Sequence, residues 1–287
     1  MNLALWGQIN VRFFAGQLQL DTVEMIAGGD ICQSYRVSDA LLRMYFIKIH
    51  VNQKLLGAEH HNLQTLQAAS IRTPKVLGCL SFETFAVLIM EYLSLSDSGD
   101  EYLLGQSLAQ LHTLLAPDTM YGFDEDNFIG HNPQYNSQSP NWEQFWWSQR
   151  LEPQLLMAQG SGFSPVSIAR IRECTHALLA DHQPAPSLLH GDLWSGNKAF
   201  LANGEPVLFD PATYYGDRET DLAFTHVFGG FNAEFYRGYH HRWPLPAGAN
   251  QRQSLYNLYH LLNHYNLFGS GYVSSVYAEL ERLGLQA

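Results

Sequence analysis

Residues 188–200, LLHGDLWSGNKAF, enclose polar side chains and two glycines between apolar flanks. Asp192 and Asn197 stand five positions apart in the short loop, so their side chains can converge on one phosphate group. The aspartate can accept a proton from a hydroxyl group, and the asparagine can offer its amide oxygen to Mg²⁺. An isolated H-G-D turn is more often structural, because Asp and Gly are common in loops. Other residues at fixed distances have to decide between the two interpretations.

A second carboxylate, Asp210, ends the apolar run PVLFDP thirteen residues after Asn197. The turn ANGEP before this run predicts a hairpin, which returns the chain to the level of the loop. Asp210 could therefore hold the same metal ion as Asn197, and such hard oxygen ligands suit Mg²⁺ with phosphates completing its shell. The order and spacing match the protein-kinase signature H-R-D-L-x-x-x-N followed by D-F-G, although Pro211 and Ala212 follow Asp210 here.

A lysine within an apolar strand is the third feature. Lys48 lies in RMYFIKIH, a strand that should be largely buried, so its charge needs a partner. Glu59, eleven residues later on an expected helix, is the candidate, although a helical glutamate is more often a solvated residue. Paired in this way, Lys48 would point at the α- and β-phosphates of a nucleotide.

The spacing of apolar residues divides the chain into two regions. Residues 23–93 read as five short strands around one helix at 54–69, whose leucines recur at helical spacing before Pro74. The turn GGDICQS at 28–34 could close its backbone over phosphates, but it does not match G-x-G-x-x-G and is weak evidence alone. After Tyr92 the apolar spacing becomes helical, except for a strand, loop and hairpin over 187–210. We expect an N-terminal sheet with one helix, then a helical lobe with a small β insert.

The composition restricts the functions that remain. A chain of 287 residues with 46% apolar residues can bury one large core or two lobes. The 16 basic and 27 acidic residues give a formal charge of −11, which disfavours binding to nucleic acid or anionic lipid. Three scattered cysteines and the lack of a leader or membrane span predict a cytoplasmic protein. An anionic substrate would need a local lysine or divalent cation, and nothing specifies an oligomeric state.

The sequence resembles the protein-kinase-like fold and, within it, the fructosamine kinase (ketosamine-3-kinase) family, related to the aminoglycoside and choline kinases. The segments that carry the resemblance are GGDI at 28–31, Lys48, HGDLWSGN at 190–197, DPATYYGDRETDLAFTHVFGGF at 210–231 and LYHLLNHYNLFGSGY at 258–272, supported by GFDEDNFIG at 122–130 and WEQFWWSQRL at 142–151. The resemblance implies a bilobal α+β fold. An N-terminal lobe, residues 1–93, would bind nucleotide with an antiparallel sheet and one main helix. A larger, mostly helical lobe, residues 94–287, would carry catalysis and substrate binding.

The family's activity implies ATP- and Mg²⁺-dependent phosphorylation of a sugar hydroxyl on a ketoamine or glycated amine, a protein-deglycation type of reaction. By position, Asp192 matches the catalytic base, and Asn197 and Asp210 match the Mg²⁺ ligands. Trp194 has no counterpart in the general kinase pattern, and its face could stack on the sugar or the amine of the acceptor. The remaining nucleotide-binding positions are Gly28, Gly29 and Asp30 in the phosphate loop, the pair Lys48 and Glu59, and Glu91, Tyr92 and Leu93 at the adenine hinge. Some family members have a cysteine at position 30, so redox behaviour is not carried over to Cys32.

Two rival functions stay open. A kinase of the same fold could act on another alcohol, such as an aminoglycoside, choline or homoserine. A non-catalytic nucleotide-binding protein is the other, and the complete set of Asp192, Asn197, Asp210 and Lys48 argues against it.

Several other residues receive structural interpretations. His260 and His264 have the i, i+4 spacing of a zinc site but lack the intervening glutamate, so packing or substrate contact is favoured. Asp221 is interpreted as a helix N-cap. The remaining structural assignments are His112 as a satisfied helix residue, His190 and Ser195 as residues that shape the loop, and Trp142, Trp146 and Trp147 as core.

Overall fold

The computed structural model describes residues 3–26, 31–69 and 71–285, so Gly28, Gly29 and Asp30 of the expected phosphate loop lie outside the described residues. The first part of the chain forms a five-stranded antiparallel sheet in the order β1-β2-β3-β5-β4. Its elements are α1 (Leu3–Phe14), η1 (Leu20–Thr22), β1 (Glu24–Ile26), β2 (Gln33–Ser38), β3 (Met44–His50), α2 (Gln53–Ala68), β4 (Val76–Ser81) and β5 (Ala86–Glu91). The five strands and α2 are those predicted from the sequence.

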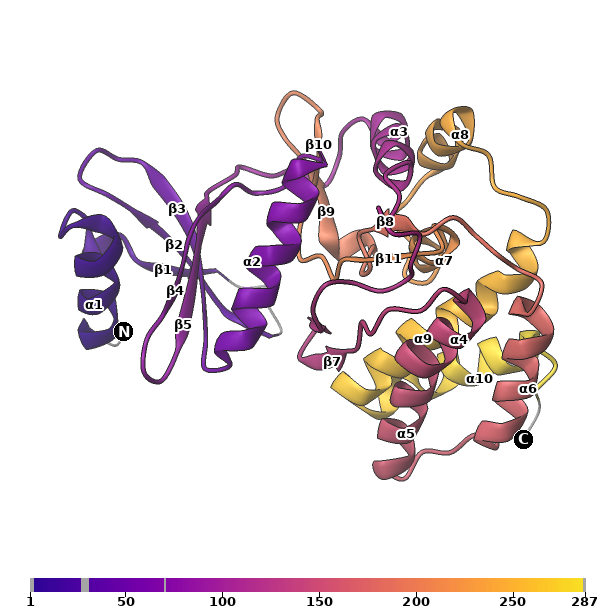
Figure 1. Ribbon diagram of the computed structural model, residues 1–287. Helices are drawn as coiled ribbons and strands as arrows, with labels where there is room; N and C mark the ends of the chain where they lie inside the picture. Colours follow the sequence, from indigo (N-terminus) through magenta and orange to yellow (C-terminus); the bar gives the residue numbers. More distant parts are fainter. Residues whose placement is uncertain (1–2, 27–30, 70, 286–287) are drawn as a thin grey trace.

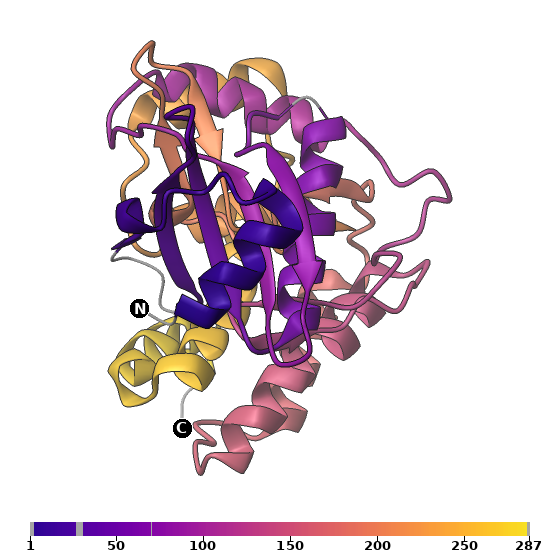
Figure 2. The ribbon, with the colours of Figure 1, turned by 90° about the vertical axis from the view of Figure 1, so that its left-hand side faces the viewer.

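Two helices cover opposite faces of this sheet (Figures 1 and 2). Strand side chains alternate between the faces, so Ile47 and Ile49 on β3 point toward α1, where they share a core with Trp6. Lys48 points the other way, toward α2 and the cleft beyond it. The sequence predicted one helix on this sheet, α2. The amphipathic helix α1 was not predicted, and it is the second.

The second part of the chain is mostly helical (Figure 1). Its elements are α3 (Glu101–His112), β6 (Asn127–Ile129), β7 (Asn132–Gln134), α4 (Trp142–Trp146), the π-helical turn η2 (Trp147–Leu151), α5 (Glu152–Gly160), α6 (Ile168–Leu179), β8 (Ser187–Leu189), η3 (Ser195–Asn197), β9 (Lys198–Phe200), β10 (Pro206–Leu208), β11 (Tyr214–Gly216), α7 (Glu219–Thr225), α8 (Ala233–Arg242), α9 (Ala249–Phe268), η4 (Ser270–Tyr272) and α10 (Val273–Arg282). Among the described residues, no helix combines the length and the apolar character needed to cross a bilayer.

Two short antiparallel pairs frame the loop at 190–197. β9 and β10 form the predicted hairpin, and β8 pairs with β11. The loop therefore runs from the end of β8 to the start of β9, and Asp210 lies between β10 and β11. This arrangement brings the loop at 190–197 and the turn that contains Asp210 together on the side that faces the five-stranded sheet.

The core of the second part is built around α9 and is rich in aromatic side chains. Trp142, Trp146 and Trp147 are buried there, which confirms their interpretation as core residues. We propose that the two lobes divide near residue 93, because β5 ends at Glu91 and the following segment pairs with β9 through Ser96 and Phe200.

Candidate active site

A cavity of about 710 Å³ separates the sheet and α2 from the loops of the second part. Nine residues singled out from the sequence line it: Lys48, Glu59, Glu91, Tyr92, Leu93, Asp192, Trp194, Asn197 and Asp210. Residues from positions 48 to 210 thus converge on one space. The size suits a nucleotide together with a small second substrate, because ligand pockets typically measure about 300–1,000 Å³.

Lys48 joins the two lobes electrostatically. Its ammonium donates to Glu59 Oε1 at 2.7 Å and also contacts the carboxylate of Asp210. The ion pair with Glu59 is the one expected from the sequence. Burial alone would lower the pKa of Lys48, but the carboxylates of Asp210 and Glu59 outweigh it and raise that pKa. The ammonium therefore stays charged, as a phosphate-binding group must.

Asn197 fixes the side chain of Asp192. The Asn197 amide Nδ2 donates to the backbone carbonyl of Asp192 at 2.8 Å and to its Oδ2 at 3.0 Å. Burial, and then the negative charge of Asp210, raises the pKa of Asp192 to about 8. Two carboxylates therefore face the same part of the cavity and repel each other's charge.

The donor set around these carboxylates fits a divalent cation. With Asn197 Nδ2 committed to Asp192, its Oδ1 accepts from no group in the described part of the chain. Nearly half of the Asp210 side chain, 48%, is exposed, so one of its oxygens can reach the cavity. A carboxylate and an amide oxygen are ligands that Mg²⁺ prefers. A cation here would also oppose the repulsion that raises the pKa of Asp192.

Asp210 adopts an unusual backbone conformation, with a φ of 54°. A non-glycine residue rarely takes this left-handed conformation, and such strain persists only where surrounding contacts enforce it. Its backbone turns the carboxylate toward Lys48 while the chain passes on into Pro211 and Ala212. The site therefore depends on whatever holds the segment after Asp210.

The interpretation of Asp221 as a helix N-cap is wrong. α7 begins at Glu219, and the buried Asp221 carboxylate instead accepts the backbone N–H groups of His190 at 2.7 Å and Gly191 at 2.8 Å. These two backbone N–H groups would otherwise be buried without a partner, and the carboxylate satisfies both. His112 Nε2 supports it from behind at 3.1 Å, which confirms the satisfied-histidine interpretation. The only feature of the sequence that could have indicated this role is a charged residue next to the apolar run LAF.

His190 shapes the loop, as expected. Its Nδ1 accepts the backbone N–H of Asp192 at 3.3 Å, and its Nε2 lies 3.1 Å from the Phe209 carbonyl. These two contacts assign the proton to Nε2, and burial lowers the pKa of the ring, so it stays neutral. His190 therefore ties the start of the loop to the residue before Asp210.

An aromatic wall closes the far side of the cavity. The Trp194 ring meets Phe228 edge-on with centroids 5.7 Å apart, and His264 lies 4.9 Å from Phe228. His264 donates from Nδ1 to the His260 carbonyl at 2.8 Å, which leaves its Nε2 as an acceptor. The sequence did not single out Phe228. This wall offers flat apolar faces and one neutral acceptor to the cavity that Asp192 also lines.

Among the described residues, His260 and His264 belong to no group of three side chains close enough to hold a metal ion. His260 is buried against Phe224, with their rings stacked 3.8 Å apart, while His264 bonds to the backbone and lines the cavity. Packing therefore describes His260, and substrate contact by His264 stays a prediction. Cys32 also lines the cavity, and burial raises the pKa of its thiol to about 12, which keeps it from ionising.

The segment expected to form the adenine hinge begins at an ion pair. Glu91 at the end of β5 accepts from Arg72 Nη1 and from the backbone N–H of Lys75, both at 2.6 Å. The Arg72 carbonyl in turn accepts the N–H of Leu208 on β10 at 2.9 Å. The chain at 91–93 therefore has a fixed position relative to both lobes.

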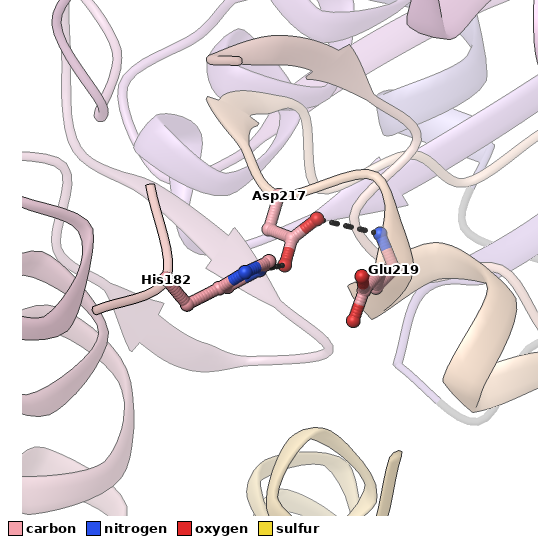
Figure 3. Close-up of side chains that lie close together, drawn as sticks. All are labelled: His182, Asp217 and Glu219. Carbon is pink, nitrogen blue, oxygen red and sulfur yellow. Dashed lines mark hydrogen bonds and ion pairs between the residues drawn. The ribbon is translucent and has the colours of Figure 1, made fainter. Parts of the chain in front are cut away.

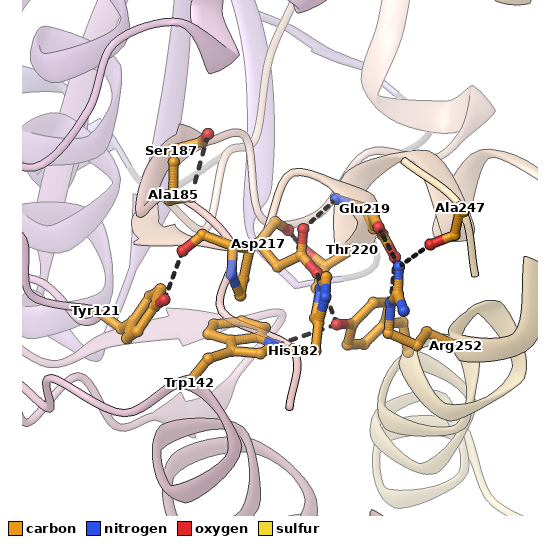
Figure 4. Close-up of polar contacts among 12 residues, drawn as sticks. Tyr121, Trp142, His182, Ala185, Ser187, Asp217, Glu219, Thr220, Ala247 and Arg252 are labelled. Atoms are coloured by element: carbon orange, nitrogen blue, oxygen red, sulfur yellow. Dashed lines mark hydrogen bonds and ion pairs between the residues drawn. The ribbon is translucent and has the colours of Figure 1, made fainter. Parts of the chain in front are cut away.

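A second cluster, His182, Asp217 and Glu219, is tight enough for a metal ion, but its groups already have partners (Figure 3). Asp217 accepts from His182 Nε2 and from the Tyr256 hydroxyl, both at 2.7 Å, while Arg252 pairs with Glu219 at 2.7 and 2.8 Å (Figure 4). The arginine supplies the positive charge that a metal would otherwise provide. This cluster joins the start of α7 to α9 and to the segment that follows α6.

Comparisons with known proteins agree with this geometry. The family model described as fructosamine kinase matches residues 8–286. A probable ketoamine kinase of Vibrio vulnificus is 41% identical over 271 residues, 92% of this chain and 93% of that protein. The crystal structure of a putative fructosamine-3-kinase from Haemophilus somnus superimposes with a TM-score of 0.89 at 28% identity, covering 96% of this chain and 95% of that one.

A more distant structure shows the breadth of the fold. A thermostable aminoglycoside phosphotransferase mutant, bound to ADP and hygromycin B, matches with a TM-score of 0.66 at 14% identity, over 97% of this chain and 96% of that one. At that identity the likeness shows the fold alone. The bilobal protein-kinase-like fold expected from the sequence is thereby confirmed.

Proposed function

Because this chain belongs to the fructosamine kinase family, we propose that it uses ATP to phosphorylate a sugar hydroxyl of a ketoamine, such as a fructosamine or a ribulosamine. The observation that carries the proposal is the convergence of Asp192, Asn197, Asp210 and Lys48 on one cavity. Nucleotide binding alone would not need a half-buried carboxylate beside the phosphate groups. We therefore favour a phosphotransferase over a passive nucleotide-binding protein.

In the proposed complex, ATP lies between the hinge and Lys48. The backbone of residues 91–93 would receive the adenine, and the Lys48 ammonium would hold the α- and β-phosphates while Glu59 keeps it in place. Asn197 and Asp210 would hold Mg²⁺, which when bound neutralises the charge of the transferring phosphoryl group. A local lysine and cation would explain how a chain of net charge −11 binds a polyanion.

Asp192 would act on the acceptor. Its carboxylate takes the proton of the sugar hydroxyl as that oxygen forms a bond to the γ-phosphorus, and the bond to the ADP oxygen breaks. Asn197 orients the carboxylate through the bond to Oδ2. Since the proton goes to Asp192 and the electron pair to ADP, no other reactant is needed.

The aromatic wall would hold the rest of the acceptor. A ketoamine carries a sugar with apolar C–H faces and a protonated secondary amine. The face of Trp194 can stack on either, and the rings of Phe228 and Trp194 can stabilise a cation. We propose Trp194 as the substrate residue on this basis.

The test is ATP turnover against a panel of fructosamines, ribulosamines, an aminoglycoside, choline and homoserine, with the phosphorylated position read by NMR. We expect ketoamines to give the highest kcat/KM. Asp192→Asn should keep ATP binding yet lower kcat by on the order of 10² or more. Turnover of that variant near the normal rate would rule out the base, and ATP consumption that no acceptor stimulates would revive the non-catalytic alternative.

A further inference from the structure

Three buried amide side chains bind the chain immediately after Asp210. Asn62 Nδ2 donates to the Pro211 carbonyl at 2.9 Å, and Asn127 Nδ2 donates to that of Thr213 at 2.8 Å. Gln134 Nε2 donates to the carbonyl between them, that of Ala212, at 2.9 Å. Three consecutive carbonyls are thus each bound by a different amide. We call Asn62, Asn127 and Gln134 the amide clamp.

The members of the amide clamp also bind one another. Asn127 Nδ2 donates to Asn62 Oδ1 at 3.2 Å, and Gln134 Nε2 donates to Asn127 Oδ1 at 2.8 Å. The Tyr259 hydroxyl on α9 completes the chain by donating to Gln134 Oε1 at 2.8 Å. All three amides are about 1% exposed. A buried amide network in which each member is satisfied has one favoured geometry, because any shift leaves a polar group without a partner.

The amide clamp draws on three elements, α2, β6 and β7. Asn62 comes from α2 in the first lobe, while Asn127 and Gln134 face each other across the β6–β7 hairpin. From the opposite side, the Ala212 N–H donates to the His190 carbonyl at 2.9 Å. The segment 211–213 is therefore held on both sides.

These contacts close a ring through the site. Asn62 lies one turn beyond Glu59 on α2, so both project from one face of the helix. Glu59 binds Lys48, Lys48 contacts Asp210, and the carbonyl of the next residue, Pro211, accepts from Asn62. A movement of α2 away from Lys48 would therefore pull on the segment that carries Asp210. A movement of that segment would in turn pull on α2.

We propose that Asn62, Asn127 and Gln134 are positioning residues that hold Asp210 in its left-handed backbone conformation and α2 against Lys48. The amide clamp keeps the cation-binding carboxylate and the phosphate-binding lysine assembled in the resting protein. The strained φ of Asp210 is maintained by these six hydrogen bonds around the following residues. No separate activation step is then needed to assemble the site.

The test compares two near-isosteric changes with a matched control. Gln134→Met keeps the side-chain length but removes both donors and the acceptor, and Asn62→Leu breaks the amide clamp from the α2 side. Trp142→Phe is the control, because it removes a buried 3.0 Å hydrogen bond to Tyr256 that does not involve segment 211–213. The control thus shows what a loss of global stability does by itself, so that an effect on the position of Asp210 can be told apart from it.

The first measurement needs neither nucleotide nor metal. Amide hydrogen exchange at Ala212, followed by mass spectrometry or NMR, should become about tenfold faster or more in Gln134→Met, and stay near the wild-type rate in Trp142→Phe. This readout tests the amide clamp even if the proposed kinase activity is wrong. Wild-type exchange in a folded Gln134→Met protein, or equal acceleration in Trp142→Phe, would overturn the proposal.

The second measurement rests on the proposed function. At saturating ATP and ketoamine, the Mg²⁺ concentration that gives half-maximal rate should rise by about tenfold or more in Gln134→Met. The KM for the ketoamine should change by less than about twofold, because the aromatic wall does not contact the amide clamp. An unchanged Mg²⁺ dependence, or a rise in both quantities together, would contradict a positioning role. If Gln134→Met does not fold, Asn62→Leu provides both readouts with the same expected outcomes.

Discussion

The carboxylate of Asp221 accepts the backbone N–H of Gly191 at 2.8 Å, thirty residues earlier in the chain and directly before Asp192. Its other oxygen, Oδ2, accepts the N–H of His190 and also a hydrogen bond from the imidazole of His112. Burial alone would raise the pKa of Asp221, but these hydrogen bonds outweigh it and lower that pKa. An ionised, fully buried carboxylate therefore fixes where the loop at 190–197 begins.

Asp221→Asn should consequently misplace Asp192. The amide cannot accept both backbone donors in the same geometry, so we expect a loss of about 2–3 kcal/mol in unfolding free energy. The kcat should fall by about tenfold while the KM for ATP changes little, because Lys48 and the hinge are untouched. Urea denaturation and steady-state kinetics check both, with the exposed Asp181→Asn as control. Wild-type kcat in Asp221→Asn would mean that the carboxylate does not position the loop.

Gly191 cannot accept a side chain. Its φ is 84°, and a Cβ there would lie only 1.9 Å from the Ala212 carbonyl oxygen. Gly191→Ala should therefore push the loop at 190–197 away from the segment after Asp210. We expect the free energy of unfolding to fall by about 2 kcal/mol or more, and turnover to fall severely. Gly160→Ala is the matched control, since its Cβ would meet nothing within 4 Å and should leave both quantities nearly unchanged. Equal behaviour of the two variants in thermal melts and assays would refute this account.

Trp194→Leu should weaken the binding of the acceptor but not that of the nucleotide. Loss of a stacking or cation–π contact is worth about 1–2 kcal/mol, so the KM for a ketoamine should rise by about tenfold. Trp194→Phe retains an aromatic face and should recover most of the affinity. Kinetics with ATP and ketoamine varied in turn separate the two sites. A matching rise in the KM for ATP would place Trp194 outside the acceptor site.

The buried His260 makes stability depend on pH. Burial, aided by His264, lowers its pKa from 6.5 to about 3, so the folded protein keeps the ring neutral while the unfolded chain binds a proton below pH 6.5. Its contribution is therefore complete above pH 6.5 and decreases as the pH falls, by about 2 kcal/mol between pH 7 and pH 5.

His260→Phe should remove this part of the acid sensitivity. Urea denaturation at pH 7 and pH 5 should show a smaller decrease for His260→Phe than for the wild type, by about 2 kcal/mol. The exposed His131→Phe serves as control and should decrease as much as the wild type. Identical decreases in His260→Phe and the wild type would show that His260 is not kept neutral.

Much of the fold could be predicted because its signals are local. The apolar run RMYFIKIH and the leucine spacing at 54–69 predicted β3 and α2. In the structure, strand alternation places Lys48 on the face opposite Ile47. Helix α1 was missed, because its apolar residues gain their stability by packing on the sheet. The β6–β7 hairpin was missed for a different reason, since each strand has only three residues and NPQ contains Asn and Pro, which are depleted in strands.

The sequence was enough to propose the reacting groups: Asp192, Asn197 and Asp210 at fixed spacing, Lys48 on a buried strand and Glu59 as its partner. Their expected chemistry follows from residue type, and their expected proximity follows from the short loop, the hairpin and the burial of the strand. The contacts that hold them in place are visible only in the folded chain. Asp221 and the amide clamp act across 30 to 149 residues of chain. No periodicity records such contacts, because a buried carboxylate or amide finds its partner only after the helices and loops around it have packed.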